Sequence, residues 1–504
     1  MSGKNPPVSE LPRVAKGASF NFLGAISRSL LGFIFIYALA RILTAEQMGL
    51  FSLGANIVMF ITIIGIAGLD AGLRRFISIS HINHDANSAW SYFLTALFIA
   101  IPLNLLLAGM LFLLSDYLAH DVFQKPDLAN ITRFLIPYLF FYVAAELLLA
   151  VTQGYKHMKY WVLCLDVVNN LLRIVFVVGL SFVGLTLYGA IFGYVLSIFF
   201  SSWLAYLFFR KVMPSDIPHN FSYKFHSLAS FSFPVSLARL VNSGTGILET
   251  ILLGYFVISK EIAIYNVALK IAVVGSIVLA SFNTVFGPLI SQFYAQNRLD
   301  ELQKLFTVVT RWTFSLSLPV FMLVAWYAAP IAALFGQEYV SGANVIVVLC
   351  LGQLVNAVTG PSGNLLLMSG HTYTNLWINV LGLVVAVALI VVLTPSYGIE
   401  GCAVAVGLAI TATNVTRVVF AQYFLKMQPY ELSYWRPIAA AAVTFLALTV
   451  WGPDRQGEVG LLSLMVTGTA GLILYGLTLF SLGLEESDRY VLAKIRQLLG
   501  GAKY

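Results

Sequence analysis

Apolar segments follow one another along the chain from Ala18 to Leu484, separated by short polar stretches. Each is about twenty residues long, which is enough for an α-helix to cross the hydrocarbon core of a membrane. The sequence has no runs of alternating polar and apolar residues of the kind that form membrane β-barrels. The pattern predicts an all-α membrane protein with about fourteen transmembrane helices, at 18–42, 47–69, 88–115, 130–152, 160–183, 186–209, 228–257, 262–289, 309–335, 342–368, 374–394, 398–425, 434–452 and 458–483.

The distribution of Lys and Arg between the predicted loops indicates the orientation, because basic residues concentrate on the cytoplasmic side of a membrane. With the N-terminus inside, the opposite loops hold only Lys125, Lys260 and Arg455, with Arg41 at the edge of a helix. The cytoplasmic side is richer in basic residues by about five to one. This bias requires an even number of helices and predicts that both termini are cytoplasmic.

Two of the cytoplasmic loops, at 69–81 and 296–306, alternate charged and apolar residues. We expect them to form short helices that lie on the membrane surface. The first seventeen residues lack the apolar core and the cleavage site of a signal peptide, so we expect them to be retained in the cytoplasm.

The composition excludes a soluble domain. The chain has 504 residues, of which 59% are hydrophobic and 10% are charged, whereas soluble domains have about 25% charged residues. The net charge of +7 is explained by the cytoplasmic loops, so we expect no nucleic-acid partner. The three cysteines all lie within apolar segments, which argues against a disulfide framework.

Similar segments relate the first half of the chain to the second. SFNFLGAISR at 19–28 matches SFSFPVSLAR at 230–239, which places Arg28 in register with Arg239. Two further pairs keep the same offset of six predicted helices: 46–57 with 260–271, and 186–196 with 396–408. Because six is even, the halves have the same orientation and form a parallel repeat. The predicted parts are a cytoplasmic segment, an N-lobe, a C-lobe, two extra helices and a cytoplasmic tail, at 1–17, 18–210, 227–426, 434–484 and 485–504.

Eight charged residues fall inside the predicted membrane helices: Arg28, Arg173, Arg239, Lys270, Arg417, Glu146, Asp166 and Glu249. Each costs about 2.5–3.5 kcal/mol at the centre of a membrane helix. Such residues therefore form pairs or line a water-filled cavity.

A polar stripe on the predicted helix 228–257 surrounds Arg239. Its members recur at intervals of three and four residues: Ser232, Ser236, Arg239, Ser243, Gly246 and Thr250. A matching stripe on the first predicted helix contains Asn21, Ala25, Arg28 and Gly32. Residues at this spacing share one face of a helix, so the stripes predict two walls of a hydrated cavity. The alternative is a helix–helix contact, where small residues also gather.

The segment KGASFNFLGAISRSLLGFIFIYALARILTAEQMGLFSL, which begins at Lys16, resembles the start of bacterial polysaccharide-transporter flippases of the O-antigen and capsule type. The likeness continues through the Gly68–Leu69 turn, the Arg74–Arg75 pair, the second repeat and the charged tail at 485–499. This family belongs to the superfamily of multidrug, oligosaccharidyl-lipid and polysaccharide (MOP) exporters, which also contains the lipid II flippases and the MATE drug exporters.

The resemblance implies two lobes around a central cavity and transport by alternating access. The expected cargo is an undecaprenyl-diphosphate-type lipid-linked oligosaccharide, the repeat unit of an O-antigen, capsule or exopolysaccharide. Transport would run from the cytoplasmic to the outer face of the bacterial inner membrane. By similarity to the lipid II branch, the helices at 434–484 would hold the isoprenoid tail. We expect membrane lipids and polysaccharide polymerase machinery as partners, and a monomer.

The candidate substrate-binding residues are Arg28, Arg239, Lys270, Asn21, Ser236 and Ser243. Guanidinium groups form forked hydrogen bonds with phosphate oxygens, which suits a diphosphate. The candidates for coupling to Na⁺ or H⁺ are Glu146 and Glu249, which lack a basic residue three or four positions away, and Asp166. For Asp166 we also consider structural pairing, either with Arg173 through Asn170 or with a neighbouring helix. We expect no cofactor and no metal site.

Three alternatives remain open. A lipid II flippase and an ion-coupled drug exporter of the MATE type would share the architecture, although the exporters usually have about twelve helices and a less cationic cavity. A membrane glycosyltransferase, polymerase or ligase would usually carry a large outward loop, and every predicted outward loop is short. The sequence contains no phosphate-binding loop of the Walker type. We therefore predict a transporter that is not driven directly by ATP, and not an enzyme.

Overall fold

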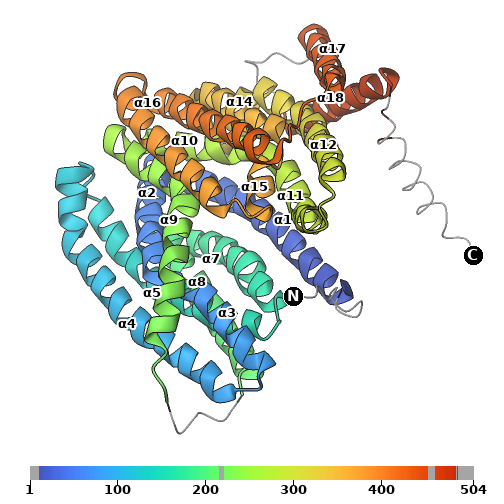
Figure 1. The fold of residues 1–504 in the computed structure, drawn as a ribbon. Coiled ribbons are helices and arrows are strands. Elements are labelled where there is room, and N and C mark those ends of the chain that lie inside the picture. The colour runs from blue at the N-terminus through green and yellow to red at the C-terminus, as the bar shows by residue number, and fades with distance from the viewer. Residues whose placement is uncertain (1–10, 215–220, 452–459, 484, 486–487, 489–504) are drawn as a thin grey trace, which may run out of the picture. The chain divides into compact units, whose positions relative to one another are not determined.

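The computed structural model describes residues 11–214, 221–451 and 460–483, together with Glu485 and Asp488; for 11–23, 242–245, 285 and 461 it describes the backbone only. All the regular secondary structure of these residues is helical, and they contain no strand (Figure 1). The predicted all-α class is therefore confirmed.

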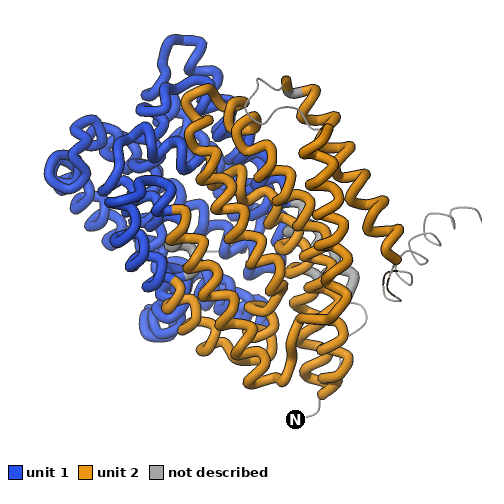
Figure 2. The backbone as a smooth tube through the Cα atoms, turned by 90° about the horizontal axis from the view of Figure 1, so that it is seen from above, with its two compact units in different colours: residues 1–267, 383–402 blue, residues 268–382, 403–504 orange. Residues whose placement is uncertain are grey.

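The chain forms two compact units, which are coloured separately in Figure 2. The first comprises residues 1–267 and 383–402. Its main elements are α1 (Leu11–Ile42), α2 (Ala45–Ile66), α3 (Leu69–Ile82), α4 (Ala86–Tyr117), the π-helix η1 (Leu118–Val122), α5 (Leu128–Gly154), α6 (Lys159–Trp161), the π-helix η2 (Val162–Val168), α7 (Asn169–Phe182), α8 (Leu187–Val212), α9 (Phe225–Phe256) and the first part of α10 (Ser259–Ala272).

The second unit comprises residues 268–382 and 403–504. It contains the end of α10, the 3-10 helix η3 (Val273–Gly275), α11 (Ser276–Ala295), α12 (Leu299–Trp326), α13 (Ala328–Phe335), the 3-10 helix η4 (Gln337–Gly342), α14 (Ala343–Thr359), α15 (Ser362–Met368), most of α16 (Thr372–Leu425), the 3-10 helix η5 (Leu432–Tyr434), α17 (Trp435–Trp451) and α18 (Leu461–Ser481). The lobes expected at 18–210 and 227–426 are defined by the sequence repeat and not by contacts. The two compact units have different boundaries from these lobes, so the lobes stay a prediction.

Twelve helices of the described residues are long and apolar enough to cross a membrane, so the predicted number of fourteen is not confirmed. One reason is α16, which contains the two spans predicted at 374–394 and 398–425. The helical path breaks at Gly398, whose φ of 56° and ψ of −139° suit a residue without a side chain. Another reason is α9, of which only Gly246–Phe256 is counted, as a shorter apolar helix.

The two predicted surface helices have a different setting in the structure. The segment 69–81 forms α3, whose Leu73 and Ile77 are fully buried in a cluster with apolar residues of α4 and α5. The end of the segment 296–306 forms the first turns of α12, where Phe306 is also fully buried. These apolar side chains pack against neighbouring helices, and the location of the two helices at the membrane surface stays a prediction.

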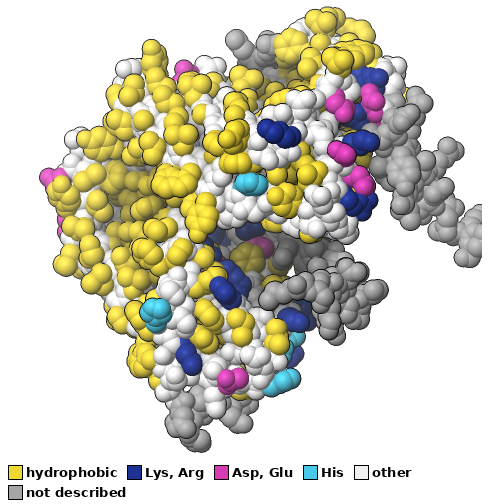
Figure 3. Space-filling model, in the orientation of Figure 1, with side chains coloured by type: hydrophobic (Ala, Val, Ile, Leu, Met, Phe, Trp, Pro, Cys, Tyr) yellow, Lys and Arg dark blue, Asp and Glu magenta, His cyan; other side chains and the backbone are white. Residues whose placement is uncertain are grey.

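Large apolar side chains are exposed along α4. Leu105, Leu106 and Leu113 are more than half exposed, and hydrophobic side chains cover much of the face that Figure 3 shows. A soluble monomer rarely exposes apolar patches of this size. The exposed face of α4 is suited to contact with lipid.

Helix α9 and Ser259, the first residue of α10, pack closely against α2 and α3 at glycine positions. A Cβ atom on Gly49 of α2 would lie 1.7 Å from the carbonyl oxygen of Ser259, and one on Gly254 of α9 would lie 2.6 Å from the Leu53 side chain. A Cβ on Gly72 of α3 would lie 2.5 Å from Ser232 Oγ. The chain therefore needs glycine at both ends of this helix contact.

We expect Gly49→Ala to lower the free energy of unfolding by about 1–3 kcal/mol or more, because the obstacle is a backbone oxygen that cannot rotate away. The matched control is Gly109→Ala on α4, where no atom lies within 4 Å of the added Cβ. Alanine there favours the helix by up to about 1 kcal/mol. Thermal unfolding of the two purified variants in detergent measures both effects. Equal melting temperatures for the two variants would contradict the close approach of Gly49 to Ser259.

Candidate functional site

A buried carboxylate at the start of α3 binds two arginines. Asp70 is fully buried, and its two oxygens accept hydrogen bonds from Arg239 of α9, at 2.9 Å from Nη1 and 2.6 Å from Nη2. Arg74 Nη2 lies 2.7 Å from the same carboxylate, one helical turn further along α3. The forked Arg239–Asp70 pair is of the strong, charge-assisted type.

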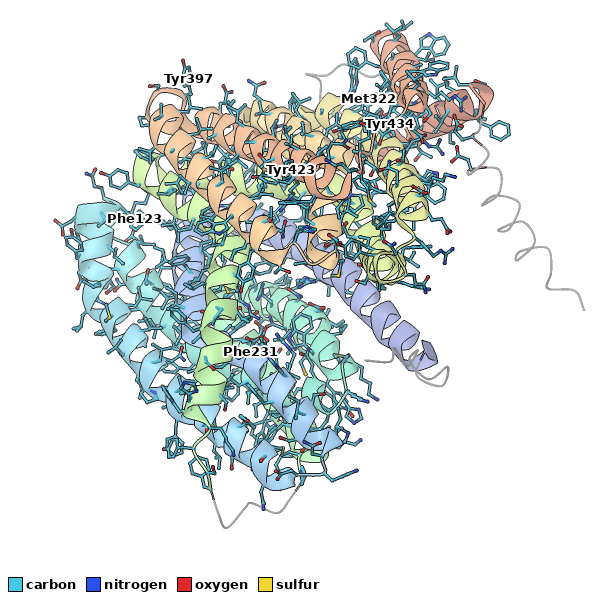
Figure 4. The ribbon with its side chains drawn as sticks, in the orientation of Figure 1. Phe123, Phe231, Met322, Tyr397, Tyr423 and Tyr434 are labelled. Carbon is cyan, nitrogen blue, oxygen red and sulfur yellow. The ribbon has the colours of Figure 1, made fainter. Side chains whose placement is uncertain are left out.

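The break between α2 and α3 explains how this pair forms. Ala67 and Gly68 both have left-handed backbone conformations, with φ of 50° and 68°. A Cβ on Gly68 would lie 2.3 Å from the carbonyl oxygen of Ser232, so glycine lets α9 approach the first turn of α3. Arg75 also contacts α9, with its guanidinium 4.5 Å from the ring centre of Phe231, which Figure 4 labels.

Arg28 of α1 occupies a second, looser ion pair. Its Nε lies 3.5 Å from Asp166 Oδ1, longer than the 2.7–2.9 Å that is typical of charged hydrogen bonds. The Arg28 side chain is 55% exposed, whereas that of Asp166 is 2% exposed. Asp166 lies on η2, and Gly24 of α1 allows the approach, since a Cβ there would lie 2.6 Å from Asp166 Oδ2.

Glu146 of α5 connects the two ion pairs. Trp161 Nε1 donates a hydrogen bond of 3.2 Å to Glu146 Oε2, and the Trp161 ring lies 6.0 Å from the guanidinium of Arg28. On its other side, Glu146 is close enough to Asp70 and Arg239 to interact with them electrostatically.

These residues form one network within the first unit, which we call the charge network: Arg28, Arg74, Arg239, Asp70, Glu146 and Asp166. Three positive and three negative charges balance when all six groups are ionised. An added anion therefore needs a carboxylate to be neutralised or displaced.

The two candidate arginines differ in their availability to a ligand. Arg239 is held by a fork to a fully buried carboxylate, and its displacement would leave Asp70 without its strongest partner. Arg28 has a long contact and a mostly exposed side chain, so a ligand reaches it at lower cost. The network favours Arg28 for ligand exchange and Arg239 for holding α9 against α3.

The other predicted substrate residues are more scattered. Ser236 is half-buried on α9, and Lys270 is exposed on the part of α10 that belongs to the second unit. The side chains of Asn21 and Ser243 lie outside the described residues. Their roles, like those of Arg28 and Arg239, stay predictions.

Asp166 does not pair with Arg173, one of the structural alternatives. Its partner is Arg28 on a neighbouring helix, the other structural alternative, while Asn170 donates to the carbonyl oxygens of Leu165 and Asp166. The Arg173 guanidinium instead lies 4.1 Å from the ring centre of Tyr194. The prediction of an Asp166–Arg173 pair is therefore wrong, because α1 supplies a nearer cation.

Glu249 of α9 differs from the other membrane carboxylates. It is 6% exposed, and it makes no ion pair or hydrogen bond with any residue that the structure describes. Its titratable neighbours are Tyr265 of α10 and Cys402 of α16, both fully buried. A buried carboxylate at membrane depth is costly without a partner, and the predicted role of Glu249 in ion coupling stays a prediction.

Lys125 lies in the loop between η1 and α5 and joins it to the end of α9. Its ammonium donates to the carbonyl oxygens of Phe123, Gly254 and Val257, at 3.1, 2.8 and 2.9 Å. Burial lowers the pKa of Lys125, whereas three carbonyl acceptors favour its charged form. Next to it is a pocket of about 350 Å³, lined by residues of α2, this loop and 255–259. Lys125 thus caps the carbonyl end of α9.

The sequence analysis missed Asp70 and the Trp161–Glu146 hydrogen bond. A signal for Asp70 was present, since Asp70 and Arg74 have the spacing of a helical ion pair. The segment was instead interpreted as a surface loop, and the second partner, Arg239, lies 169 positions away in the chain.

Membrane-length helices enclosing a balanced network of charges define a polytopic membrane protein of the transporter class. The chain belongs to the family described as polysaccharide biosynthesis protein, whose model matches residues 14–294. The MatE family model also matches, over residues 234–392. The predicted relationship to polysaccharide flippases of the MOP superfamily is confirmed.

Solved structures share the fold. The lipid II flippase MurJ in an inward closed conformation has a TM-score of 0.73 at 12% identity, covering 91% of this chain and 97% of that one. An inward-facing multidrug resistance MATE family transporter has a TM-score of 0.66 at 16% identity, covering 79% and 94%. A MOP superfamily transporter from Pyrococcus furiosus has a TM-score of 0.59 at 18% identity, covering 84% and 99%. At these identities the likeness establishes the fold alone.

One curated relative is the teichuronic acid biosynthesis protein TuaB of Bacillus subtilis (strain 168). It is 26% identical over 137 residues, which is 27% of this chain. The chain spans 28% of the length of that relative.

Proposed function

We propose that the protein flips an isoprenoid-diphosphate-linked oligosaccharide from the cytoplasmic to the outer face of the bacterial inner membrane. One observation supports this more than any other: Arg28 is an exposed guanidinium within an apolar helix, and its ion pair with Asp166 is a loose contact of 3.5 Å. Guanidinium groups bind phosphate oxygens through forked hydrogen bonds. Membership of a polysaccharide biosynthesis family supports a glycan as the cargo.

In this proposal, binding of the diphosphate to Arg28 releases Asp166. Asp166 is almost fully buried, so an uncompensated negative charge there is costly. The released carboxylate takes up H⁺ or Na⁺, which makes cargo binding and ion binding favour each other. Such coupling is reciprocal by thermodynamic necessity. Glu146 and Glu249 are further candidates for the same ion.

The helices α17 and α18 supply a site for the isoprenoid tail in this proposal. Leu446 and Val450 of α17 and Leu462 and Met465 of α18 are all more than 60% exposed, as a hydrocarbon-binding surface requires. The protein acts as a monomer, in contact with membrane lipids and the polymerase machinery that consumes the cargo.

A second candidate is a lipid II flippase, favoured by the 0.73 TM-score of the MurJ fold. Purified protein in liposomes distinguishes the cargoes. We expect a lipid-linked oligosaccharide to become accessible to an added enzyme at the opposite leaflet, at a rate that increases with an H⁺ or Na⁺ gradient. Faster movement of lipid II than of any lipid-linked oligosaccharide would favour the second candidate. Movement of neither, with export of a cationic drug, would contradict both.

We expect Glu249→Gln to reduce the dependence of transport on the ion gradient by about tenfold, since glutamine cannot change charge. Transport in the two gradient directions measures this dependence. Glu301→Gln is the matched control, because Glu301 is exposed and pairs with Arg298. Glu249 would have no coupling role if its variant kept the gradient dependence of the control.

A further inference from the structure

Arg417, on the second half of α16, is held by amides. Its Nη2 donates to Asn379 Oδ1 at 2.7 Å, and its Nη1 donates to Asn414 Oδ1 at 3.1 Å. No carboxylate of the described residues lies within ion-pair distance of Arg417. Arg28 and Arg239, by contrast, both face carboxylates. Within the described part of the chain, the positive charge of Arg417 therefore has no carboxylate partner.

One edge of the Arg417 guanidinium also has unused donors. Its Nε is buried and has no hydrogen-bond partner among the residues that the structure describes. A guanidinium has five N–H donors, and the two asparagines account for two of them. An Nε–H beside an amino N–H is the arrangement that binds two oxygens of a phosphate or a carboxylate.

The first turn of α15 packs against this guanidinium. A Cβ on Gly363 would lie 3.2 Å from both Nε and Cζ of Arg417, so any larger side chain would press on the guanidinium. The preceding residue, Ser362, is fully buried, and its hydroxyl has no partner. Buried polar groups without partners are uncommon in proteins and call for an explanation such as a ligand.

A structural clamp between the two halves of α16 is the simpler account. Asn379 and Asn414 lie on opposite sides of the break at Gly398, and Arg417 bridges them. A clamp between two amides needs hydrogen-bond donors but no charge. A glutamine would supply such donors. A charge at membrane depth is costly when it is not compensated. An arginine here is better explained by an anion.

We propose that Arg417, with Asn379, Asn414 and the first turn of α15 at Ser362 and Gly363, forms a binding site in the second unit for an oxyanion, a phosphate or carboxylate group. The source of the anion is either the lipid-linked glycan or the headgroup of an anionic phospholipid. The first source rests on the proposed function, and the second does not.

The test is ligand binding by the purified full-length protein in a neutral detergent, followed by tryptophan fluorescence and by ligand-induced thermal stabilisation. The probes are sodium pyrophosphate, undecaprenyl diphosphate, phosphatidylglycerol and, as the uncharged reference, undecaprenol. The variants are Arg417→Gln and Arg417→Lys. Arg173→Gln is the matched control, since it removes a similar charge from a guanidinium that stacks on Tyr194.

We expect Arg417→Gln to weaken pyrophosphate binding by about tenfold or more, the effect of losing charged hydrogen bonds. Arg417→Lys keeps the charge but not the fork and should recover part of the affinity. Arg173→Gln should change the affinity by less than about twofold. Melting of Arg417→Gln without ligand, within a few degrees of the wild type, establishes that the variant is folded.

The lipid probes identify the source. A selective loss of undecaprenyl diphosphate binding supports the glycan carrier, and an equal loss for phosphatidylglycerol supports a phospholipid site. Unchanged binding of every anion by Arg417→Gln would overturn the inference, even where the wild type flips its cargo. Conversely, loss of pyrophosphate binding in a protein that flips no lipid would leave this site standing while the proposed function fails.

Discussion

Replacing Asp70 with alanine should lower the free energy of unfolding by about 3–5 kcal/mol, the usual cost of removing one partner from a buried ion pair. Asp70 is fully buried and accepts hydrogen bonds from both Arg239 and Arg74. Its removal leaves two arginines without their carboxylate and releases α9 from the first turn of α3. Unfolding in mixed micelles, followed by tryptophan fluorescence, measures the loss.

The matched control for this prediction is Asp116→Ala. Asp116 also pairs with an arginine, Arg133, but its side chain is 59% exposed. An exposed pair contributes about 0–1 kcal/mol, so this variant should stay close to the wild type. If Asp70→Ala and Asp116→Ala lowered the free energy of unfolding by similar amounts, water would have to screen the ion pairs of Asp70 as it screens that of Asp116. Asp70→Asn keeps the acceptor oxygen and should fall between the two.

Hydropathy alone was enough to predict most of the helices. The span predicted at 130–152 is observed as Leu128–Gly154, and the one at 186–209 as Leu187–Val212. These boundaries follow from the length that a lipid bilayer imposes on apolar segments, which is a local property of the sequence. The boundary predicted between 394 and 398 lies at the observed break at Gly398. The π-helical turn around Asp166 could not be predicted in this way, because it leaves the hydropathy unchanged.

The candidate site could be predicted only in part, because its partners are distant in sequence. The membrane depth of Arg28, Arg239, Glu146 and Asp166 was enough to mark them as unusual. Which carboxylate each arginine faces depends on how α1, α3, α5 and α9 pack. Ser232 of the α9 stripe lies against Gly68 and Gly72, so the helix contact, one of the two alternatives, is present there. The hydrated cavity wall stays a prediction.

Replacing Arg28 with alanine should reduce the transport of lipid-linked oligosaccharide by at least about tenfold, because the cargo phosphate loses a charged, forked donor. Surface glycan in a host that lacks its own flippase measures transport in the cell, and liposomes measure it with purified protein. Arg133→Ala, which removes a half-buried arginine that pairs with the exposed Asp116, is the control and should retain normal transport.

A pair of Asp166 variants tests whether this loss arises from the cargo or from an uncompensated carboxylate. In Arg28→Ala, Asp166 loses its counter-charge while remaining almost fully buried. Arg28→Ala combined with Asp166→Asn removes that charge as well, and transport should stay low if Arg28 binds the cargo. Asp166→Asn alone frees Arg28 from its ion pair. We therefore expect this variant to bind undecaprenyl diphosphate several-fold more tightly than the wild type. Its transport should also depend less on the ion gradient. Recovery of transport in the double variant would show instead that Arg28 serves only to neutralise Asp166.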